Sequence, residues 1–320
     1  MRGRGLHMVK FKSFIKEEKT LAILILFFIL ASIFVRGFFS RSNLINVLIQ
    51  VSIYGITACG MTFAIISGEF DLSVGSTMAI TGLLCVVLEP YAGQVGAIIL
   101  ALLVAALIGL CNGILIAKFH ISSFIVTIGM QYIVKGIALR ISNGKPVASS
   151  CPWFQMIGNT TIAGVPAMVI IMLICVLISA YVLRQTRFGR NVYTIGGNRE
   201  VAHYSGIKVV KDRTIVFVIA SVTAGIAGLL NASRLNTGSA SHGDNLALSV
   251  ITGTVIGGTS LSGGVGGMGK TMSGILLLNF LSNALDIVRV YSYYQTAIRG
   301  LLLIAIIAME AEHAYKANSY

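Results

Sequence analysis

The sequence predicts an all-α, polytopic membrane protein, and two observations carry this prediction. Of the 320 residues, 56% are hydrophobic and 11% are charged, whereas a soluble domain averages about 25% charged residues. Apolar runs of about 20 residues also recur along the chain, which is the length a helix needs to cross a hydrocarbon core. These runs lack the strict alternation of membrane barrel strands, so we expect helices.

Ten apolar segments are predicted to span the membrane. Basic residues precede the first segment, but no small-residue cleavage site follows it, so we expect an uncleaved span rather than a signal peptide. The segments cover residues 20–37, 43–67, 72–89, 93–117, 121–140, 164–183, 213–232, 246–262, 271–287 and 292–310.

The distribution of basic residues predicts that both termini lie inside. Ten spans place both ends on one side, and cytoplasmic loops are enriched in Lys and Arg. With the N-terminus inside, the inner segments hold sixteen of these residues and the outer loops hold six, while Lys135 and Arg299 lie within spans. We predict a basic cytoplasmic N-terminus over residues 1–19, a single transmembrane domain over 20–314 and a cytoplasmic tail over 315–320.

The net charge of +13 does not indicate a nucleic-acid partner. The basic residues lie in loops and are not gathered into a patch with aromatic residues. The five cysteines form no C-x-x-C pair, so neither a metal site nor a disulfide framework is predicted.

Residues 264–271 match the phosphate-loop pattern G-x-x-x-x-G-K-[ST]. That loop works only between a strand and a helix of a soluble α/β domain. Here Lys270 falls in a tight turn between two apolar segments, and we treat the match as accidental. We therefore expect no cofactor in this chain; a membrane-bound NTPase is the alternative.

The longest inner loop covers residues 184–213 and carries seven basic residues against Glu200 and Asp212. Gly196-Gly197-Asn198 predicts a turn, and the residues from Arg199 predict a short helix that ends at Gly206. The basic charge of this loop, taken alone, is explained by anchoring the loop at the inner face of the membrane. A short helix below the membrane would also suit the docking of a cytoplasmic motor.

Within this loop, Glu200-Val201-Ala202-x-x-x-Gly206 resembles the E-A-A-x-x-x-G loop of ATP-binding-cassette (ABC) transporter permeases, with Val201 replacing the first Ala. Other stretches resemble permeases of the ribose and simple-sugar ABC importer family, in the same order over nearly the whole chain. They are GMTFAIISGEFDLSVGSTMAITG (60–82), FIVTIGMQYIVKGIALRISNGKPV (124–147), RFGRNVYTIGGN (187–198), IGGTSLSGGVG (256–266) and SYYQTAIRG (292–300).

The resemblance implies a permease subunit, multi-pass in the bacterial cytoplasmic (inner) membrane, that forms the pathway for a sugar or sugar-like solute. It implies a cytoplasmic ABC ATPase that holds the ATP and Mg²⁺, an extracytoplasmic solute-binding protein, and a second permease subunit that is either another copy or a paralogue. The implied coupling residues are Gly196, Gly197, Asn198, Glu200, Ala202 and Gly206.

The second and third segments meet at Ser67-Gly68-Glu69-Phe70-Asp71-Leu72-Ser73. Asp71 and Ser73 suit the N-terminal cap of the third segment. The junction also suits a broken helix that faces a polar substrate, and the two interpretations are compatible. Relatives mostly show Gly-Gly-Ile-Asp-Leu-Ser here; Glu69 and Phe70 depart from that pattern, which leaves the solute open.

Two similar polar pairs lie in the fifth and tenth segments. Gln131 with Lys135, and Gln295 with Arg299, each place an amide and a cation four residues apart on one helix face. Charges within spans usually face a water-filled cavity or a partner, and snorkelling to the interface is the alternative, harder for Arg299 than for Lys135. The shared Q-x-x-x-[KR]-G pattern indicates an inverted five-helix repeat.

Asn279 and Asn283 lie on one face of the ninth segment and are further candidates for the pathway. The predicted pathway residues are Glu69, Asp71, Ser73, Gln131, Lys135, Asn279, Asn283, Gln295 and Arg299. A secondary transporter driven by an ion gradient is the second hypothesis. It would couple through a buried carboxylate, for which Glu69, Asp71 and Asp286 are available.

Overall fold

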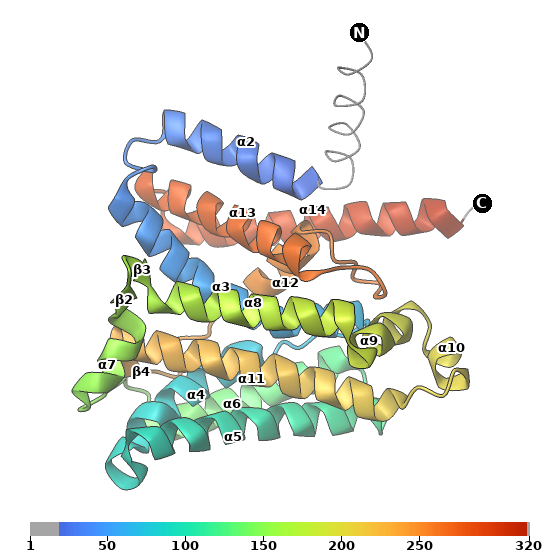
Figure 1. Ribbon diagram of the computed structural model, residues 1–320, viewed down its shortest axis with the longest axis horizontal. Helices are drawn as coiled ribbons and strands as arrows, with labels where there is room; N and C mark the ends of the chain where they lie inside the picture. Colours follow the sequence, from blue (N-terminus) through green and yellow to red (C-terminus); the bar gives the residue numbers. More distant parts are fainter. Residues whose placement is uncertain (1–18, 319–320) are drawn as a thin grey trace.

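A computed structural model describes residues 19–318, and this part of the chain is mostly helical (Figure 1). The predicted basic N-terminus, apart from Lys19, lies outside the described residues, as do the last two residues of the predicted tail. The helices are α2 (Lys19–Phe34), α3 (Arg41–Ile66), α4 (Val74–Val87), α5 (Glu89–Ala117), α6 (Ser123–Ser142), α7 (Pro152–Asn159), α8 (Ala167–Gln185), α9 (Arg187–Gly197), α10 (Arg199–Tyr204), α11 (Val209–Leu235), α12 (Leu246–Ile256), α13 (Met268–Ile287) and α14 (Ser292–Asn318).

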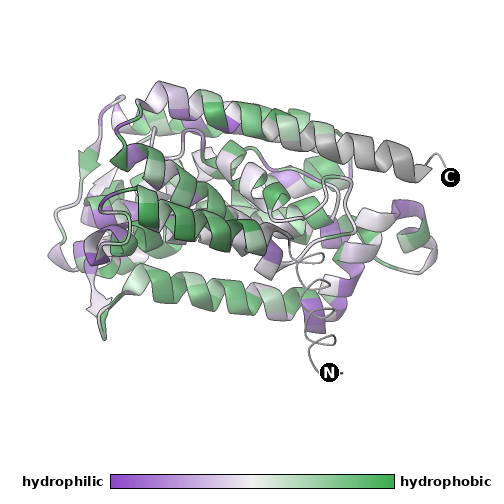
Figure 2. Ribbon diagram, turned by 90° about the horizontal axis from the view of Figure 1, so that it is seen from above, coloured by the Kyte–Doolittle hydropathy of each residue, from purple (hydrophilic) through white to green (hydrophobic). Residues whose placement is uncertain are grey.

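A helix lies in each of the ten predicted segments. Five of the described helices, α3, α5, α6, α8 and α11, are long and apolar enough to cross a membrane. Three further helices are apolar but shorter, namely residues 20–34 of α2, α4 and α12. Hydrophobic residues fill the middle of the bundle and hydrophilic residues concentrate towards its ends (Figure 2). The chain is therefore a polytopic, mostly helical membrane protein.

Two long helices form the centre of the bundle. In α3, 83% of the most apolar stretch is buried, and in α11 67%, against 17% in α6. α11 packs against α3, α4 and α5, and α3 also packs against α8 and α13. Small residues permit this close packing: a Cβ at Gly60 would lie 2.5 Å from the Cα of Ala220, and one at Gly228 would lie 2.1 Å from the Met78 carbonyl oxygen.

Two helices of the bundle are short, and each follows an irregular segment. α4 has 14 residues and comes after the junction 67–73. α12 has 11 residues and comes after residues 239–245. The irregular stretch before α12 touches the first turn of α4, because a Cβ on Gly243 would lie 1.7 Å from the carbonyl oxygen of Gly75. The beginnings of α4 and α12 therefore meet inside the bundle.

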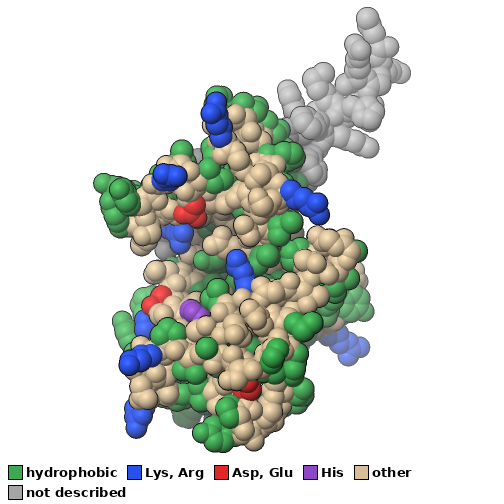
Figure 3. Space-filling model, turned by 90° about the vertical axis from the view of Figure 1, so that its left-hand side faces the viewer, with side chains coloured by type: hydrophobic (Ala, Val, Ile, Leu, Met, Phe, Trp, Pro, Cys, Tyr) green, Lys and Arg blue, Asp and Glu red, His purple; other side chains and the backbone are tan. Residues whose placement is uncertain are grey.

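Two short antiparallel strand pairs lie at the end of the bundle away from α9 and α10 (Figure 1). β1 (Val147–Ala148) pairs with β4 (Thr237–Gly238), with Val147 opposite Gly238. β2 (Thr161–Ile162) pairs with β3 (Val165–Pro166). Figure 3 views this end of the molecule, where the basic side chains are scattered rather than gathered.

The predicted loop 184–213 is more helical than expected. The prediction of a turn at Gly196-Gly197-Asn198 is wrong in part. Gly196 and Gly197 are the last residues of the helix α9, and only Asn198 has extended backbone. Thr186 begins α9 by accepting a hydrogen bond from the Gly189 N–H at 3.1 Å. The short helix predicted after Asn198 is confirmed as α10, and Gly206 follows it with a φ of +79°.

Candidate functional site: a polar pocket and the α9–α10 end

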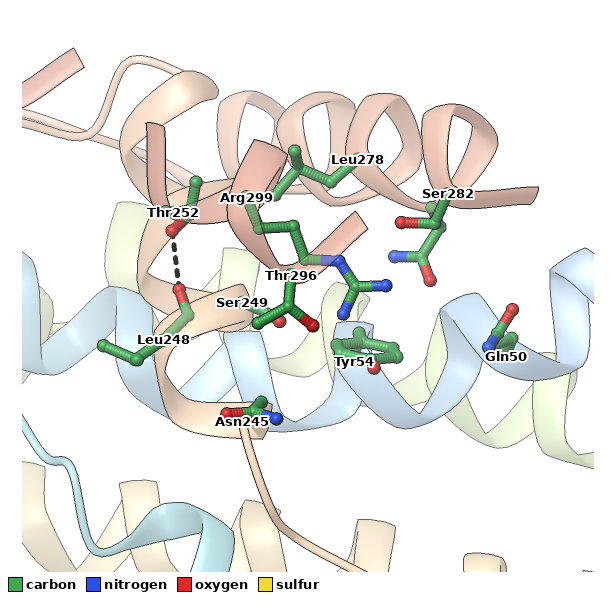
Figure 4. Close-up of a pocket in the computed structure, with 12 residues that line it drawn as sticks. Gln50, Tyr54, Asn245, Leu248, Ser249, Thr252, Leu278, Ser282, Thr296 and Arg299 are labelled. Carbon is green, nitrogen blue, oxygen red and sulfur yellow. Dashed lines mark hydrogen bonds between the residues drawn. The ribbon is translucent and has the colours of Figure 1, made fainter. Parts of the chain in front are cut away.

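A pocket of about 190 Å³ opens between α3, α12, α13 and α14 (Figure 4). This volume is below the roughly 300–1,000 Å³ of drug-sized sites and suits a small solute. Amide, hydroxyl and guanidinium groups project into it from all four helices and from the segment before α12. The polar lining residues are Gln50, Tyr54, Asn245, Ser249, Thr252, Asn279, Ser282, Thr296 and Arg299.

Arg299 is the only Lys or Arg side chain among the residues that line this pocket. Its guanidinium points down towards Tyr54, beside Thr296 and Ser249 (Figure 4). Within the described residues, no Asp or Glu side chain forms an ion pair with it. An arginine presents five N–H donors and no acceptor, so the pocket offers unused donors to a ligand.

The pocket also borders the N-terminus of the short helix α12. Asn245 precedes α12 with a left-handed φ of +63°, and its side chain makes no capping bond. The first N–H groups of a helix lack partners within the helix. α12 thus begins at the pocket wall with Asn245, and its next turn supplies Ser249 and Thr252.

The structure brings only two of the predicted pathway residues, Asn279 and Arg299, to this pocket. Sequence reasoning missed Gln50 and Tyr54, which lie four residues apart on α3, and the pocket residues from α12. The polar pair on α3 was a usable signal, because it interrupts an apolar segment at helical spacing.

Asp71 and Ser73 belong to a separate buried group at the junction between α3 and α4. The Asp71 Oδ1 atom accepts the Ser73 N–H at 2.9 Å and the Ser73 hydroxyl at 2.5 Å. Asn112 of α5 donates to the Ser73 hydroxyl oxygen at 2.9 Å. The capping prediction is wrong in detail: Ser73 occupies the N-cap position of α4, but its side chain makes no capping bond.

Glu69 lies at the same junction but has different partners, and it is only 3% exposed. Its Oε1 atom accepts from Arg199 of α10 at 2.7 Å and also from Arg213 of α11. Both arginines come from the segment 184–213 or its edge. The structure therefore gives Glu69 partners from the predicted coupling loop rather than from the pocket.

Three chain segments touch backbone to backbone at the end of the bundle that carries α9 and α10, which we call the α9–α10 end. A Cβ on Gly196 would lie 1.8 Å from the Ile66 carbonyl oxygen, and one on Gly263 would lie 2.7 Å from the Gly196 carbonyl oxygen. The Gly264 N–H donates to the Ile66 carbonyl at 2.8 Å. Only glycine permits such close approach at these points.

Tyr193 of α9 adds a side-chain link to this contact. Its hydroxyl donates to the Gly266 carbonyl at 2.9 Å. Burial raises the pKa of Tyr193, and nearby Arg184 opposes that shift. The phenol is therefore held in the protonated form that donates this bond.

The other predicted coupling residues lie in α10 or directly next to its ends. The Asn198 side chain accepts the N–H groups of Glu200 and Val201 at 2.9 and 3.0 Å, a typical N-cap. Ala202 is fully buried, while Glu200 is exposed. α10 thus packs one face on the bundle and leaves the face with Glu200 open.

The remaining predicted pathway residues lie away from the pocket, and three of the four have partners elsewhere. Lys135 pairs with Asp244 at 2.6 Å, and Asn283 exchanges two 2.9 Å bonds with Asn43 of α3. Gln295 donates to Asp286 at 2.7 Å and to the Val290 carbonyl at 2.9 Å. Gln131 is partly exposed on α6. None of these four residues lines the pocket.

Residues 264–271 do not have the geometry of a phosphate-binding loop. They comprise the end of the α12–α13 connection and the first turn of α13, and the described element before them is a helix rather than a strand. The Gly264 N–H is bonded to the Ile66 carbonyl. The Thr271 hydroxyl, which would have to hold Mg²⁺, bonds with the hydroxyls of Thr62 at 2.9 Å and Thr259 at 3.3 Å. Among the described residues, no group of three His, Cys, Asp or Glu side chains is placed to hold a metal.

Comparison with known proteins identifies the family. Residues 43–307 match the family described as branched-chain amino acid transport system / permease component. The ribose import permease protein RbsC of Escherichia coli K12 is 34% identical over 93% of this chain and 95% of its own length. The L-arabinose transport system permease protein AraH of the same organism is 36% identical over 91% of this chain and 89% of its own length.

A third relative, the L-arabinose ABC transporter permease protein AraH of Azospirillum brasilense, is 33% identical over 92% of this chain and 87% of its own length. No solved structure matches the chain. The predicted resemblance to sugar-importer permeases is confirmed, and these matches favour it over a secondary transporter. The chain belongs to the family of branched-chain amino acid transport system permease components, and it is a transport permease.

Proposed function

We propose that this chain is the membrane-spanning subunit of an ABC importer for a monosaccharide, with a pentose as the first candidate. The observation that carries the proposal is the pocket at the start of α12, in a chain whose relatives are named for ribose and arabinose. A pentose presents several hydroxyl groups and no charge. Amides, hydroxyls and one guanidinium supply the hydrogen bonds that such a ligand needs.

The inverted five-helix repeat is part of this proposal. If α2 to α6 form one half and α8 with α11 to α14 form the other, then α3 matches α11 and α4 matches α12. Both members of the first pair are central, and both members of the second are short helices after irregular segments. Discontinuous helices at matching positions of two halves are the usual sign of a transporter's substrate site.

We further propose ten spans with both termini in the cytoplasm of a bacterium and the helices in its inner membrane. The α9–α10 end collects Lys118, Lys270 and the basic residues of 184–213, as cytoplasmic loops do. On this orientation a solute-binding protein would deliver the sugar to the end of the bundle opposite α9 and α10.

The α9–α10 end is proposed to dock the partner ATPase. The exposed face of α10 offers Glu200, while buried Ala202 and the Gly196 contact fix α9 and α10 to the bundle. A second permease subunit, another copy or a paralogue, would complete the pathway. ATP and Mg²⁺ belong to the ATPase, so Lys270→Ala is expected to keep ATP-driven uptake.

The test is extraction in a mild detergent followed by mass spectrometry and reconstitution. We expect an ABC ATPase to co-purify, and proteoliposomes with the binding protein to take up radiolabelled D-ribose or L-arabinose only with internal ATP. A permease that purifies alone and drives uptake from an ion gradient would overturn the proposal. Glu200→Arg should remove the ATPase from the complex but leave the permease in the membrane.

A further inference from the structure

One buried carboxylate joins three elements of the α9–α10 end. The Glu69 Oε1 atom accepts from Arg199 at 2.7 Å and from Arg213. Glu69 belongs to the α3–α4 junction, Arg199 to α10 and Arg213 to α11. A buried charge is costly unless it is paired, so the Glu69 carboxylate depends on these two guanidinium groups.

The two arginines are not equivalent. The Arg213 side chain is 5% exposed, whereas the Arg199 side chain is 50% exposed. Arg213 is fixed on the central helix α11 and serves as the permanent counter-ion. Arg199 can return to water, because half of its side chain is already exposed and Arg213 would still pair with Glu69. The Glu69–Arg199 bond is thus the reversible part of the cluster.

The surroundings give this bond room to open and a short path to the pocket. A cavity of about 340 Å³ borders Glu69, Phe70 and both arginines. Gly68 has a φ of +76°, and a Cβ built on it would lie 4.0 Å from the Arg199 Nη2 atom. The junction then leads to Ser73 and α4, whose Gly75 touches Gly243 just before the pocket residue Asn245.

We propose that the Glu69–Arg199 ion pair is a reversible latch that couples α10 to the α3–α4 junction. Arg199 is a positioning residue: when α10 moves, the guanidinium pulls or releases Glu69, and the junction carries that shift to the start of α4. The inference rests on the proposed docking of the ATPase at α10, but the latch itself is a property of this chain.

The variant that tests the latch is Arg199→Gln, because it leaves the Glu69–Arg213 pair intact in the core. Arg190→Gln is the matched control, since Arg190 is an exposed arginine of α9, and Arg199→Lys keeps the charge. The first readout is hydrogen–deuterium exchange of residues 196–207 in the purified permease without partners. We expect faster exchange in Arg199→Gln, wild-type exchange in Arg190→Gln and partial recovery in Arg199→Lys.

The second readout is ATP-dependent uptake of D-ribose and L-arabinose by the complete complex in proteoliposomes. Arg199→Gln should retain the ATPase but transport about tenfold more slowly, the order expected for a lost coupling contact. Glu69→Gln should slow uptake and also lower the melting temperature of the permease, because it leaves the buried Arg213 guanidinium without its counter-ion.

Three outcomes would overturn the latch. They are unchanged exchange in Arg199→Gln, faster exchange with wild-type uptake, and loss of the ATPase from the Arg199→Gln complex, which would make Arg199 a docking contact. A wild-type complex that takes up neither sugar with ATP would refute the proposed function instead, while the exchange measurement still decides whether the ion pair holds α10.

Discussion

The pocket and the α9–α10 end are both rich in polar groups, but they use these groups differently. At the α9–α10 end, glycine backbones touch, the Tyr193 hydroxyl is bonded, and the Glu69 carboxylate has two arginines. In the pocket, Arg299 has no described ion-pair partner and polar side chains line an open volume. The first region pairs its polar groups within the chain, whereas the second leaves guanidinium donors unpaired beside an open volume.

The largest effect is expected where the backbones touch. Gly196→Leu places a side chain where a Cβ would already lie 1.8 Å from the Ile66 carbonyl oxygen. Overpacking in a well-packed site costs about 1–3 kcal/mol and more when backbone must move. We expect loss of uptake and a lower apparent melting temperature of the purified permease.

Gly197→Ala is the matched control, because a Cβ there meets nothing within 4 Å. It should retain uptake and thermal stability. If Gly196→Leu transported as well as Gly197→Ala, the close contact between α9 and α3 would not be needed for coupling.

The pocket is expected to respond in transport rather than in stability. Arg299→Gln removes the guanidinium, and hydrogen bonds to charged groups contribute about 1.5–3 kcal/mol. Sugar uptake at limiting concentration should therefore fall about 10- to 100-fold, with little change in melting temperature. Arg289→Gln, an exposed arginine outside the pocket, should transport normally; equal losses in both variants would remove Arg299 from the pathway.

A hydrogen-bonded polar pair between two helices should show the opposite result, an effect on melting temperature rather than on uptake. Asn43 and Asn283 hydrogen-bond to each other, and Asn283 does not line the pocket. Interhelical hydrogen bonds in membrane proteins contribute about 0.6 kcal/mol on average. The double variant Asn43→Leu with Asn283→Leu should lower the melting temperature slightly and keep uptake. A large loss of uptake would return Asn283 to the pathway.

The smallest effect is expected at Lys135. Its ion pair with Asp244 has side-chain exposures of 35% and 48%, and such exposed pairs contribute about 0–1 kcal/mol. Lys135→Gln should leave uptake within about twofold of wild type. A loss as large as that of Arg299→Gln would show that the two cations of the repeated Q-x-x-x-[KR]-G pattern share one role.

Local sequence patterns were enough to predict the helices of the ten apolar segments and α10. Apolar runs determined where helices form, since a chain this apolar has few other ways to satisfy its backbone, and Asn198 and Gly206 marked the two ends of α10. The order of the family-like stretches along nearly the whole chain was enough to predict the family. Two further helices, α7 and α9, were not predicted; α9 was missed because its two terminal glycines are typical of a turn.

Tertiary structure decided which polar residues act together. Glu69 was assigned to the substrate pathway from its place at a helix break, yet Arg199 and Arg213, its partners, are 130 and 144 residues away. The pocket likewise joins Tyr54 of α3 with Arg299 of α14. Helix periodicity determines which residues share a face, but only the packing of helices against one another decides which faces meet.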